Sequence, residues 1–336
     1  MKKRIGAAVL AVVALAAIYN SRSGPSVAPD FPTNTMIADQ SEVVINIPNG
    51  STGSQIAQLL FDNEVIKSSE AFFRVAVGDK RSETIAPGNH RISQNISARQ
   101  ALEQLLDPNR IPNLIRIFEG GWKSEVVTAL VAYGFSTRDI SKAFTVAKLP
   151  QGFKQVEGLL FPAQYSFAKG TTATMAVQAM IDRFTAEESS QQILLGNNKF
   201  SAAQLLTIAS IVQAEGDEKD FAKVSRVIHN RLAIGMPLQM DSTVHYIKKV
   251  RGQIFLSTQS TLINSPYNTY RKYGLPPGPI GSPGVAAMTA ALKPAVGDWL
   301  YFITVAPGDT RFTKSNDEFN SWKALYEKNR KAGAFK

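Results

Sequence analysis

The chain has 336 residues, no cysteine and a formal net charge of +10, so disulfides, thiol catalysis and thiolate metal sites are excluded. Its length favours two domains, and 44% hydrophobic residues are enough to build a core in each and to exclude a disordered chain. The basic residues are scattered and match no nucleic-acid-binding motif, so we expect an anionic surface or polymer as the partner and no nucleic acid.

The N-terminus combines a basic flank with an apolar segment. The residues KKR precede an unbroken apolar run from Ile5 to Tyr19, and such a basic flank stays on the cytoplasmic side. As a helix the run would be about 22 Å long, which is short for a hydrocarbon core of about 30 Å. We expect residues 1–20 to be a single-pass anchor in the plasma (inner) membrane, or a signal peptide cleaved near ALAA. Either way, the rest of the chain lies outside the cytoplasm.

A tether and a strand follow this segment. Residues 21–41 are rich in Ser, Pro, Asn and Asp and show no periodicity, which is typical of a flexible linker. The next segment, EVVINIP, places Val43, Ile45 and Ile47 on one side of an extended chain. This alternation predicts a half-buried strand that ends at the turn PNGS.

Two helices are predicted after this strand. Ile56 and Leu60 recur at helical spacing after Ser54, a candidate N-cap, and ISARQALEQLL repeats the pattern with Ser97 as its cap. The segment DPNRIPN then interrupts regular structure, because proline has no amide hydrogen to donate. We therefore expect residues 42–110 to form a small α+β module.

The remainder, residues 111–336, is predicted to be a larger mixed α+β domain. LIRIFEGG reads as a strand that runs into a turn, SEVVTALVAYG as a helix that ends at Gly134, and TTATMAVQAMIDRFTAEE as a further helix. SAAQLLTIASIVQAE opens with Ser201 and Gln204 in the spacing of a capping box and stops before Gly216. These signals predict a domain that mixes helices and strands.

The last third of the chain contains a long irregular segment. An amphipathic helix is expected from about 218 to 232, and a Pro- and Gly-rich stretch without periodicity occupies 262–285. Loops of this length in compact domains usually carry function or are disordered, and the tyrosines of this one favour packing. AAMTAALKPA and DWLYFITVA are predicted to close the domain as a helix and a buried strand.

Glu215 is the first candidate for chemistry. Seven residues of α-helix turn the chain through about 700°, which leaves Glu215 about 20° from Ile208 on the apolar side. Burial disfavours the charged carboxylate and raises its pKa, which is what a general acid needs at neutral pH. Geometry leaves a structural alternative open, in which Glu215 caps the helix end or pairs with Lys219 or Lys223.

Other carboxylates lie beside glycine or aromatic residues in the same half of the chain. They are Glu119 in FEGGW, Glu157 in EGLLFP and Asp241 in PLQMDST. Glycoside cleavage commonly uses a pair of carboxyl groups, although each of these alone is also explained by turn or N-cap chemistry. The histidines show no ligand spacing, and no phosphate loop or GxSxG motif is present, so we expect no metal and no cofactor.

Five segments form an ordered set: FEGGW, EGLLFP, IASIVQAE, VIHNRLAIGMPLQMDSTVHY and SPYNTYRKYGLPPGPIGSPG. This set resembles the YceG-like endolytic murein transglycosylases. The corresponding family patterns are PEGWT, EGYLFP, LASIVEKE, VFxNRLxxGMxLQxDPTVxY and SxYNTYxxxGLPPGPIxxPG. The similarity keeps the family order across roughly residues 42–320, so it is far more specific than one short motif.

The resemblance implies a membrane-anchored lytic enzyme that cuts inside the glycan strands of peptidoglycan and so limits the elongation of nascent strands. The family's catalytic glutamate is the last residue of IVEKE, which falls on Glu215, whereas the other glutamate of that pattern is Gln213 here. Glu215 is then expected to protonate the glycosidic oxygen after N-acetylmuramic acid. As carboxylate it takes the proton of that sugar's C6 hydroxyl, which leaves a 1,6-anhydro end.

The resemblance also extends to the small module and to the substrate cleft. The opening IPNGSTGSQIAQLL is similar to the family's IPxGxSxxxIAxLL, which implies that residues 42–110 are a LysM-like glycan-binding module. The implied partners are glycan strands, the plasma membrane and, near it, peptidoglycan synthases. The residues expected to bind substrate are Glu157, Asn230, Gln239, Asp241, Tyr267, Asn268 and Thr269.

The chain departs from the family pattern at three positions. The family's FPDTY is FPAQY here, so Ala163 replaces an acid, and DPT is DST, so Ser242 replaces a proline. Near the C-terminus GGHTF corresponds to GDTRF, so Thr310 replaces a histidine. These losses and the net charge of +10 keep a non-catalytic peptidoglycan-binding scaffold protein open as an alternative. A glycan hydrolase of the muramidase type is the enzymatic alternative.

Overall fold

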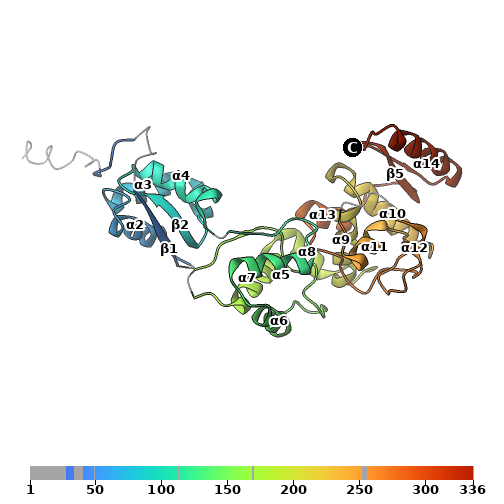
Figure 1. The fold of residues 1–336 in the computed structure, drawn as a ribbon, viewed down its shortest axis with the longest axis horizontal. Helices are drawn as coiled ribbons and strands as arrows, with labels where there is room; N and C mark the ends of the chain where they lie inside the picture. The colour runs from blue at the N-terminus through green and yellow to red at the C-terminus, as the bar shows by residue number, and fades with distance from the viewer. Residues whose placement is uncertain are drawn as a thin grey trace, which may run out of the picture. The chain divides into compact units, whose positions relative to one another are not determined.

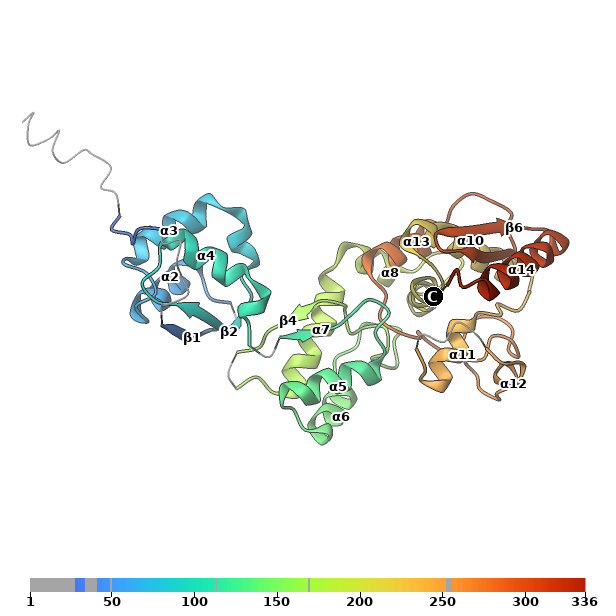
Figure 2. The ribbon, with the colours of Figure 1, turned by 45° about the horizontal axis from the view of Figure 1, so that its top comes forward.

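The computed structural model describes residues 28–33, 41–48, 50–112, 114–168, 170–251 and 256–335. They form two compact units (Figures 1 and 2): the first contains the described residues up to Pro112 with 166–168, and the second contains the others. The expected anchor at 1–20 and most of the linker lie outside the described residues. Within the described ranges, no helix combines the length and the apolar character needed to cross a membrane.

The smaller unit is a two-stranded sheet covered by three helices. Strand β1 (Glu42–Ile47) pairs antiparallel with β2 (Gly88–Ser93), and the helices are α2 (Gly53–Asp62), α3 (Ser69–Gly78) and α4 (Ala98–Leu106). One continuous core lies between sheet and helices, and its largest fully buried side chains are Leu60, Phe72, Ile92, Ile96, Leu102 and Leu105. The predicted α+β character of this part is confirmed.

The start of α2 differs from the prediction. Thr52, not Ser54, is the N-cap, because its side chain accepts the backbone N–H of Gln55 while the Gln55 side chain accepts the N–H of Thr52 at 2.8 Å. This reciprocal capping box satisfies two N–H groups that would otherwise lack partners. The cap at Ser97 is confirmed and has the same arrangement. Helix α3 was not predicted, because Phe73 and Val77 are exposed and blur its apolar stripe.

Residues 28–33, which fall in the predicted linker, contact the smaller unit. The side chain of Ala28 belongs to the unit's core. The Ser68 hydroxyl donates to the Pro29 carbonyl at 2.7 Å, and the N–H of Ala98 donates to Oδ1 of Asp30 at 2.9 Å. This short segment therefore covers the N-termini of α3 and α4.

The larger unit is mostly helical. Its helices are α5 (Lys123–Tyr133), α6 (Thr137–Val146), α7 (Ala173–Ala186), α8 (Glu188–Leu195), α9 (Ala202–Glu215), α10 (Phe221–Ala233), α11 (Asp241–Lys248), α12 (Thr258–Thr261), α13 (Val285–Leu292) and α14 (Asn316–Lys331). Two antiparallel strand pairs accompany them: β3 (Ile115–Arg116) with β4 (Gln164–Tyr165), and β5 (Tyr301–Ala306) with β6 (Asp309–Thr313). The mixed α+β fold expected from the sequence is confirmed.

Helix α9 lies at the centre of this unit and packs against α8, α10 and α13. Every residue from Leu205 to Val212 is buried, because α9 has neighbours on several sides. The Pro- and Gly-rich loop is fastened to this helix, since the hydroxyl of Ser210 accepts the backbone N–H of Ile280 at 3.0 Å. The irregular segment predicted at 262–285 is therefore packed onto α9 around the buried Ile280.

The C-terminal end of the unit was predicted incompletely. Strand β5 forms as expected but is half-buried along most of its length, because a two-stranded sheet covered by α14 leaves part of its surface open. Strand β6 and α14, not β5, close the domain. Helix α14 has no fully buried residue, so its sequence lacks the apolar run by which a helix is recognised.

Gly158 allows the EGLLFP segment to contact the Pro- and Gly-rich loop. Its φ is +85°, and a Cβ atom there would lie 2.6 Å from Cβ of Pro279. We expect Gly158→Ala to lower the free energy of unfolding by about 2–3 kcal/mol, from backbone strain plus overlap with the proline ring. Gly152→Ala is the matched control, because φ is +89° and the space is empty. Urea denaturation of both variants measures the difference, and equal losses would contradict the packing at Pro279.

Candidate active site

Glu215 is the last residue of α9. Ile208, Ile211 and Val212 of this helix are fully buried, and Glu215 keeps part of its surface accessible to solvent. Its Oε1 atom accepts a hydrogen bond of 3.0 Å from the backbone N–H of Ser242. The carboxyl group is therefore held against the first turn of α11 and remains partly reachable from outside.

Helix α11 can supply this donor because the N–H groups of a first helical turn have no acceptor inside the helix. Ser242 is the second residue of α11, and the positive end of the helix dipole also favours a negative group there. Because an amide N–H can only donate, Oε1 acts as the acceptor, and the proton of the neutral acid resides on Oε2. The backbone N–H of Ser242 binds Oε1, so the proton on Oε2 can be given to a ligand.

The surroundings of Glu215 raise its pKa from the usual 4.5 to about 7. Burial is the main cause, because removing water destabilises the carboxylate more than the neutral acid. The side chain and the backbone N–H of Ser242 lower the pKa, and so does the positive charge of Arg231. The negative charge of Asp241 raises it. Near pH 7, both forms of Glu215 are populated, which suits a group that first gives and then takes a proton.

The structure does not contain the surface ion pair considered as an alternative role for Glu215. Lys219 Nζ donates to the carbonyl of Gly308 at 2.6 Å, and Lys223 Nζ lies 5.3 Å from the ring centroid of Phe312. Within the described part of the chain, Glu215 takes part in no salt bridge. Its carboxyl group is held by α11 instead of by a lysine.

Asp241 brings a second carboxylate next to Glu215. It is the first residue of α11, directly before Ser242, and Oδ1 accepts a short hydrogen bond from the hydroxyl of Tyr270. Burial and the charge of Asp241 raise the pKa of Tyr270, so the phenol stays protonated and keeps donating at neutral pH. Of the three carboxylates Glu119, Glu157 and Asp241, the last is the one whose charge acts on Glu215.

The residues between α10 and α11 are fastened to the Pro- and Gly-rich loop. The backbone N–H of Gln239 donates to the Thr269 carbonyl at 3.1 Å, and that of Met240 donates to Thr269 Oγ1 at 2.9 Å. The Asn268 amide donates to two carbonyls of its own loop at 2.9 and 2.7 Å. Asn268 and Thr269 are buried and hold the loop, whereas Gln239 is exposed and its side chain points to no described partner.

Two further residues expected to bind substrate make their contacts inside the protein. Glu157 is 2% exposed, and its carboxylate accepts the backbone N–H of Lys123 at 2.9 Å and the hydroxyl of Tyr246 at 2.8 Å. Burial raises the pKa of Glu157. The Asn230 amide donates to two carbonyls just before β5 at 3.2 and 2.9 Å. Both side chains therefore position neighbouring groups.

An aromatic and cationic cluster lies next to Glu157, and only one of its members, Tyr267, was predicted. The ring of Tyr246 lies 5.2 Å from that of Tyr267 and 6.1 Å from that of Trp122, measured between centroids. Lys249 Nζ is 3.6 Å from the centroid of Tyr246, and the Arg251 guanidinium is 4.0 Å from that of Trp122. Trp122 ends the FEGGW segment, but no sequence motif marks Lys249 or Arg251.

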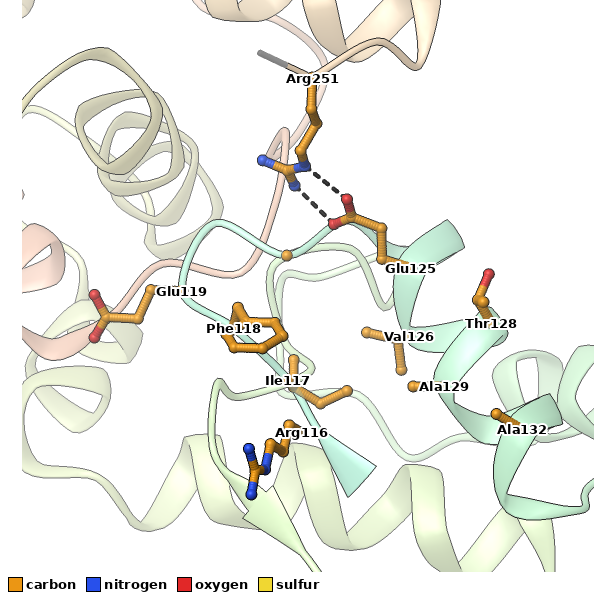
Figure 3. Close-up of a pocket in the computed structure, with 11 residues that line it drawn as sticks. Arg116, Ile117, Phe118, Glu119, Glu125, Val126, Thr128, Ala129, Ala132 and Arg251 are labelled. Atoms are coloured by element: carbon orange, nitrogen blue, oxygen red, sulfur yellow. Dashed lines mark hydrogen bonds and ion pairs between the residues drawn. The ribbon is translucent and has the colours of Figure 1, made fainter. Parts of the chain in front are cut away.

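Two neighbouring cavities open beside these residues. The smaller has a volume of about 230 Å³, and its walls include Gln213 and Ala214 of α9 with Ser242 and His245 of α11. The larger, of about 530 Å³, lies between segment 116–121 and α5 (Figure 3). Glu119 and Arg251 line both cavities, so the two are adjacent. Glu215 lines neither, but the wall of the smaller cavity contains the residue before it and its hydrogen-bond donor.

Only one of the three departures from the family pattern contacts Glu215. The carbonyl of Ala163 accepts the N–H of Ile117 at 2.9 Å beside the β3–β4 pair, and Thr310 Oγ1 lies 2.9 Å from Thr304 Oγ1 in the β5–β6 hairpin. Ser242 provides the N–H that binds Glu215, and proline at this position has no such hydrogen.

The chain is similar to proteins of known name over most of its length. The model of the YceG-like family matches residues 45–324. An endolytic murein transglycosylase of Bacillus subtilis (strain 168) is 32% identical over 314 residues, which are 85% of each chain. One of Streptococcus pneumoniae serotype 2 (strain D39) is 26% identical across 82% of this chain, and the match spans 57% of that protein.

A solved structure has the same fold. The crystal structure of a yceG-like protein from Listeria monocytogenes superposes with a TM-score of 0.57 at 28% sequence identity, and the match covers 83% of this chain and 98% of that one. Because the family model spans well over half of the sequence, the chain belongs to the YceG-like family.

Proposed function

We propose that this chain is an endolytic murein transglycosylase in which Glu215 is the proton donor and acceptor. The observation that carries the proposal is the carboxyl group of Glu215, with its pKa raised to about 7 and its Oε1 atom bound by the Ser242 N–H beside a cavity. Family membership and the B. subtilis relative named endolytic murein transglycosylase support the same activity. The chain acts on peptidoglycan, a polymer outside the cytoplasm.

The first step is protonation of the leaving group. Neutral Glu215 gives the proton on Oε2 to the glycosidic oxygen that follows N-acetylmuramic acid, and the bond from that oxygen to C1 breaks. The backbone N–H of Ser242 already donates to Oε1, so it stabilises the carboxylate as the proton leaves. Asp241, held by Tyr270, supplies the negative charge that favours an oxocarbenium-like state at C1.

The second step uses the carboxylate that the first step leaves. Oε2 takes the proton of the C6 hydroxyl of the same sugar, and O6 bonds to C1. The products are a 1,6-anhydro end and a free hydroxyl on the leaving sugar, and Glu215 is neutral again. No water is consumed, so one residue serves as acid and then as base, with a pKa near the working pH in both roles.

The remaining candidate residues divide into contacts and supports. Gln239, Asp241 and Tyr267 retain exposed surface and are proposed to contact the sugars. Asn268 and Thr269 hold the loop that carries Tyr267 and Tyr270. Glu157 and Asn230 also have supporting roles, because their side chains bind other groups of the protein.

Digestion of purified sacculi tests the reaction. The full chain, solubilised in detergent, is expected to release muropeptides with 1,6-anhydro ends, which mass spectrometry identifies as 18 Da lighter than their hydrated forms. Products with only reducing ends would instead assign the chain as a hydrolase of the muramidase type. Binding to sacculi without any release of muropeptides would assign it as a scaffold protein.

The pH dependence of the reaction follows from the raised pKa of Glu215. The first step needs the neutral acid, whose fraction falls as pH rises through about 7. We expect the rate of anhydro-muropeptide release to fall about tenfold per pH unit well above this value. Initial rates between pH 5 and pH 9 measure the midpoint. A rate that stays level across pH 7 to pH 9 would show that no acid with this pKa takes part.

We also propose a glycan-binding role for the smaller unit and a membrane anchor at residues 1–20. A cavity of about 390 Å³ in the smaller unit is lined by the polar side chains of Ser51, Gln55, Gln58 and Asp62, which come from the segment similar to the family's LysM-like opening. The basic flank and apolar run at the N-terminus support the anchor. Such an anchor would keep the enzyme close to peptidoglycan synthases.

A further inference from the structure

We propose that the larger cavity, between segment 116–121 and α5, binds the peptide stem attached to the muramyl sugar. This inference rests on the proposed function, because it concerns a second part of the same substrate. The cavity has a volume of about 530 Å³, which is within the range of sites that enclose a ligand of drug size. A hydroxyl or acetamido group of a sugar is far too small to fill it.

The walls of the cavity are mostly apolar. Helix α5 contributes Val126, Ala129 and Ala132, which recur every three residues and therefore share one face of the helix. Ile117 and Phe118 approach from the facing segment (Figure 3). Phe118 is 73% exposed and continues the apolar surface formed by Ile117 and α5, and a contiguous apolar surface of this kind is typical of a binding site.

One unpaired cation lies at the edge of this apolar surface. At one end, Glu125 and Arg251 form a two-bonded ion pair of 2.6 and 2.7 Å, so their charges compensate each other. Arg116 lies at the opposite end (Figure 3) and is exposed. Its guanidinium makes no hydrogen bond or ion pair with any described residue. The carboxylate of Glu119, the remaining charged group of the lining, points away from α5 (Figure 3) and lies against Gly284. The cavity thus offers small apolar contacts and one free site for a carboxylate.

These properties fit a peptide stem better than a sugar. A sugar ring carries polar groups on nearly every carbon, and they would lose their hydrogen bonds against the apolar wall. A peptide stem begins with alanine, whose methyl group fits beside Ala129 and Ala132, and it carries free carboxylates that can form a two-bonded pair with Arg116. An acyl chain would use the apolar wall but not the cation.

The position of the cavity also agrees with this ligand. It shares Glu119 and Arg251 with the smaller cavity, and Ser242 in the wall of that smaller cavity binds Glu215. The stem leaves the muramyl ring through its lactyl ether, so the stem of the sugar being cut must lie in a site next to the one that holds the ring. The larger cavity is such a site.

The experiment compares two substrates: glycan strands that carry stems, and the same strands after an amidase has removed them. We expect the wild-type chain to have a kcat/KM about tenfold higher on stem-bearing strands, the value of burying one or two methyl-sized groups. Ala129→Phe fills the cavity and is expected to abolish this preference by raising KM on stem-bearing strands, with unchanged kinetics on stem-free strands. Val131→Phe, on the same helix but outside the lining, is the matched control.

A second pair of variants tests the charge. Arg116→Ala is expected to lower kcat/KM about fivefold on stem-bearing strands only, because an exposed ion pair contributes less than the apolar contacts. Arg138→Ala removes an exposed arginine of α6 that lines no described cavity. We expect it to leave kcat/KM unchanged on both substrates. Circular dichroism checks that α5 is intact in all variants.

Several outcomes would overturn the assignment. The peptide stem is excluded if the wild type shows no preference between the two substrates. It is also excluded if Ala129→Phe loses activity equally on both substrates. An Ala129→Phe variant that loses no activity excludes it as well, and this result is the one expected if the cavity binds an acyl chain or a protein. If the wild type cuts neither substrate, the proposed function fails instead. Calorimetry with a soluble muramyl peptide then still decides the cavity, because the wild type should bind it and Ala129→Phe should not.

Discussion

Glu215→Gln is expected to lower the rate of anhydro-muropeptide release by about a thousandfold, within the range that loss of a positioned general acid produces. Glutamine keeps the shape of the side chain and an oxygen for the Ser242 N–H, but its amide protons are far too weakly acidic to be given to the leaving oxygen. The measurement is kcat on sacculi with products quantified by mass spectrometry. Binding to sacculi should be retained, because the charge-neutral replacement preserves the fold.

Glu218→Gln is the matched control for this variant. Glu218 lies three residues further along the chain and is exposed, so its replacement changes the same charge without touching the site. Full activity is expected. Glu215→Gln with wild-type kcat would remove Glu215 from the mechanism, whatever products the enzyme makes.

Glu215→Gln is also expected to change how the free energy of unfolding depends on pH. The folded pKa of Glu215 is raised to about 7 from 4.5, so the folded state binds this proton more tightly than the unfolded state does. Wild-type stability therefore falls as pH rises from about 4.5 to 7, and the loss is complete above that range. In thermal unfolding, the melting temperature of Glu215→Gln relative to that of the wild type should therefore be higher at pH 8 than at pH 4. A pH-independent difference would mean that Glu215 is not desolvated.

Ser242→Pro is expected to raise the pKa of Glu215 by about one unit, because a hydrogen bond to a charged group is worth about 1.5–3 kcal/mol and part of that loss is recovered from water. Proline lacks the N–H but is accepted in the first turn of a helix, where that N–H has no helical partner. The descending limb of the pH profile should move upward by the same amount. At pH 7 we expect kcat to fall about tenfold, because the carboxylate formed in the first step loses a donor.

Ser242→Ala separates the effect of the Ser242 hydroxyl from that of its backbone N–H. It removes the buried hydroxyl, which helps to lower the pKa of Glu215, and it keeps the backbone N–H on Oε1. Because both the side chain and the backbone of Ser242 lower the pKa of Glu215, the descending part of its pH profile should move to higher pH, but less far than that of the proline variant. If activity falls at the same pH in the proline and alanine variants, the backbone N–H does not control the pKa of Glu215. Carbon-13 NMR of labelled glutamate carboxyls gives the pKa without relying on activity.

Local features of this chain were predictable because they depend on a few neighbouring residues. The capping boxes at Ser97 and Ser201 require only a donor and an acceptor three positions apart. The phase of α9 placed Ile208 and Ile211 in the core and directed attention to Glu215. Helix α3 and helix α14 were not predicted, because exposed apolar residues in one and the lack of buried residues in the other hide the helical period.

The candidate substrate residues show where sequence reasoning stops. A motif names Asn268 and Thr269, but only the folded loop shows that they are buried and hold other groups. The same holds for Glu157, whose partner Tyr246 is far away in the sequence. Residue identity fixes what a side chain can donate or accept, and packing decides whether a partner inside the protein already uses it.

The sequence by itself determined the family, the helix that carries Glu215 and the side of that helix on which Glu215 lies, since helical periodicity is a local property. Tertiary structure alone decided the chemistry of the carboxyl group. Its pKa depends on burial and on α10 and α11, which bring Arg231, Asp241 and the Ser242 N–H to it from up to 27 positions away. Electrostatic interactions and desolvation act through space, so they are fixed only when these segments pack together.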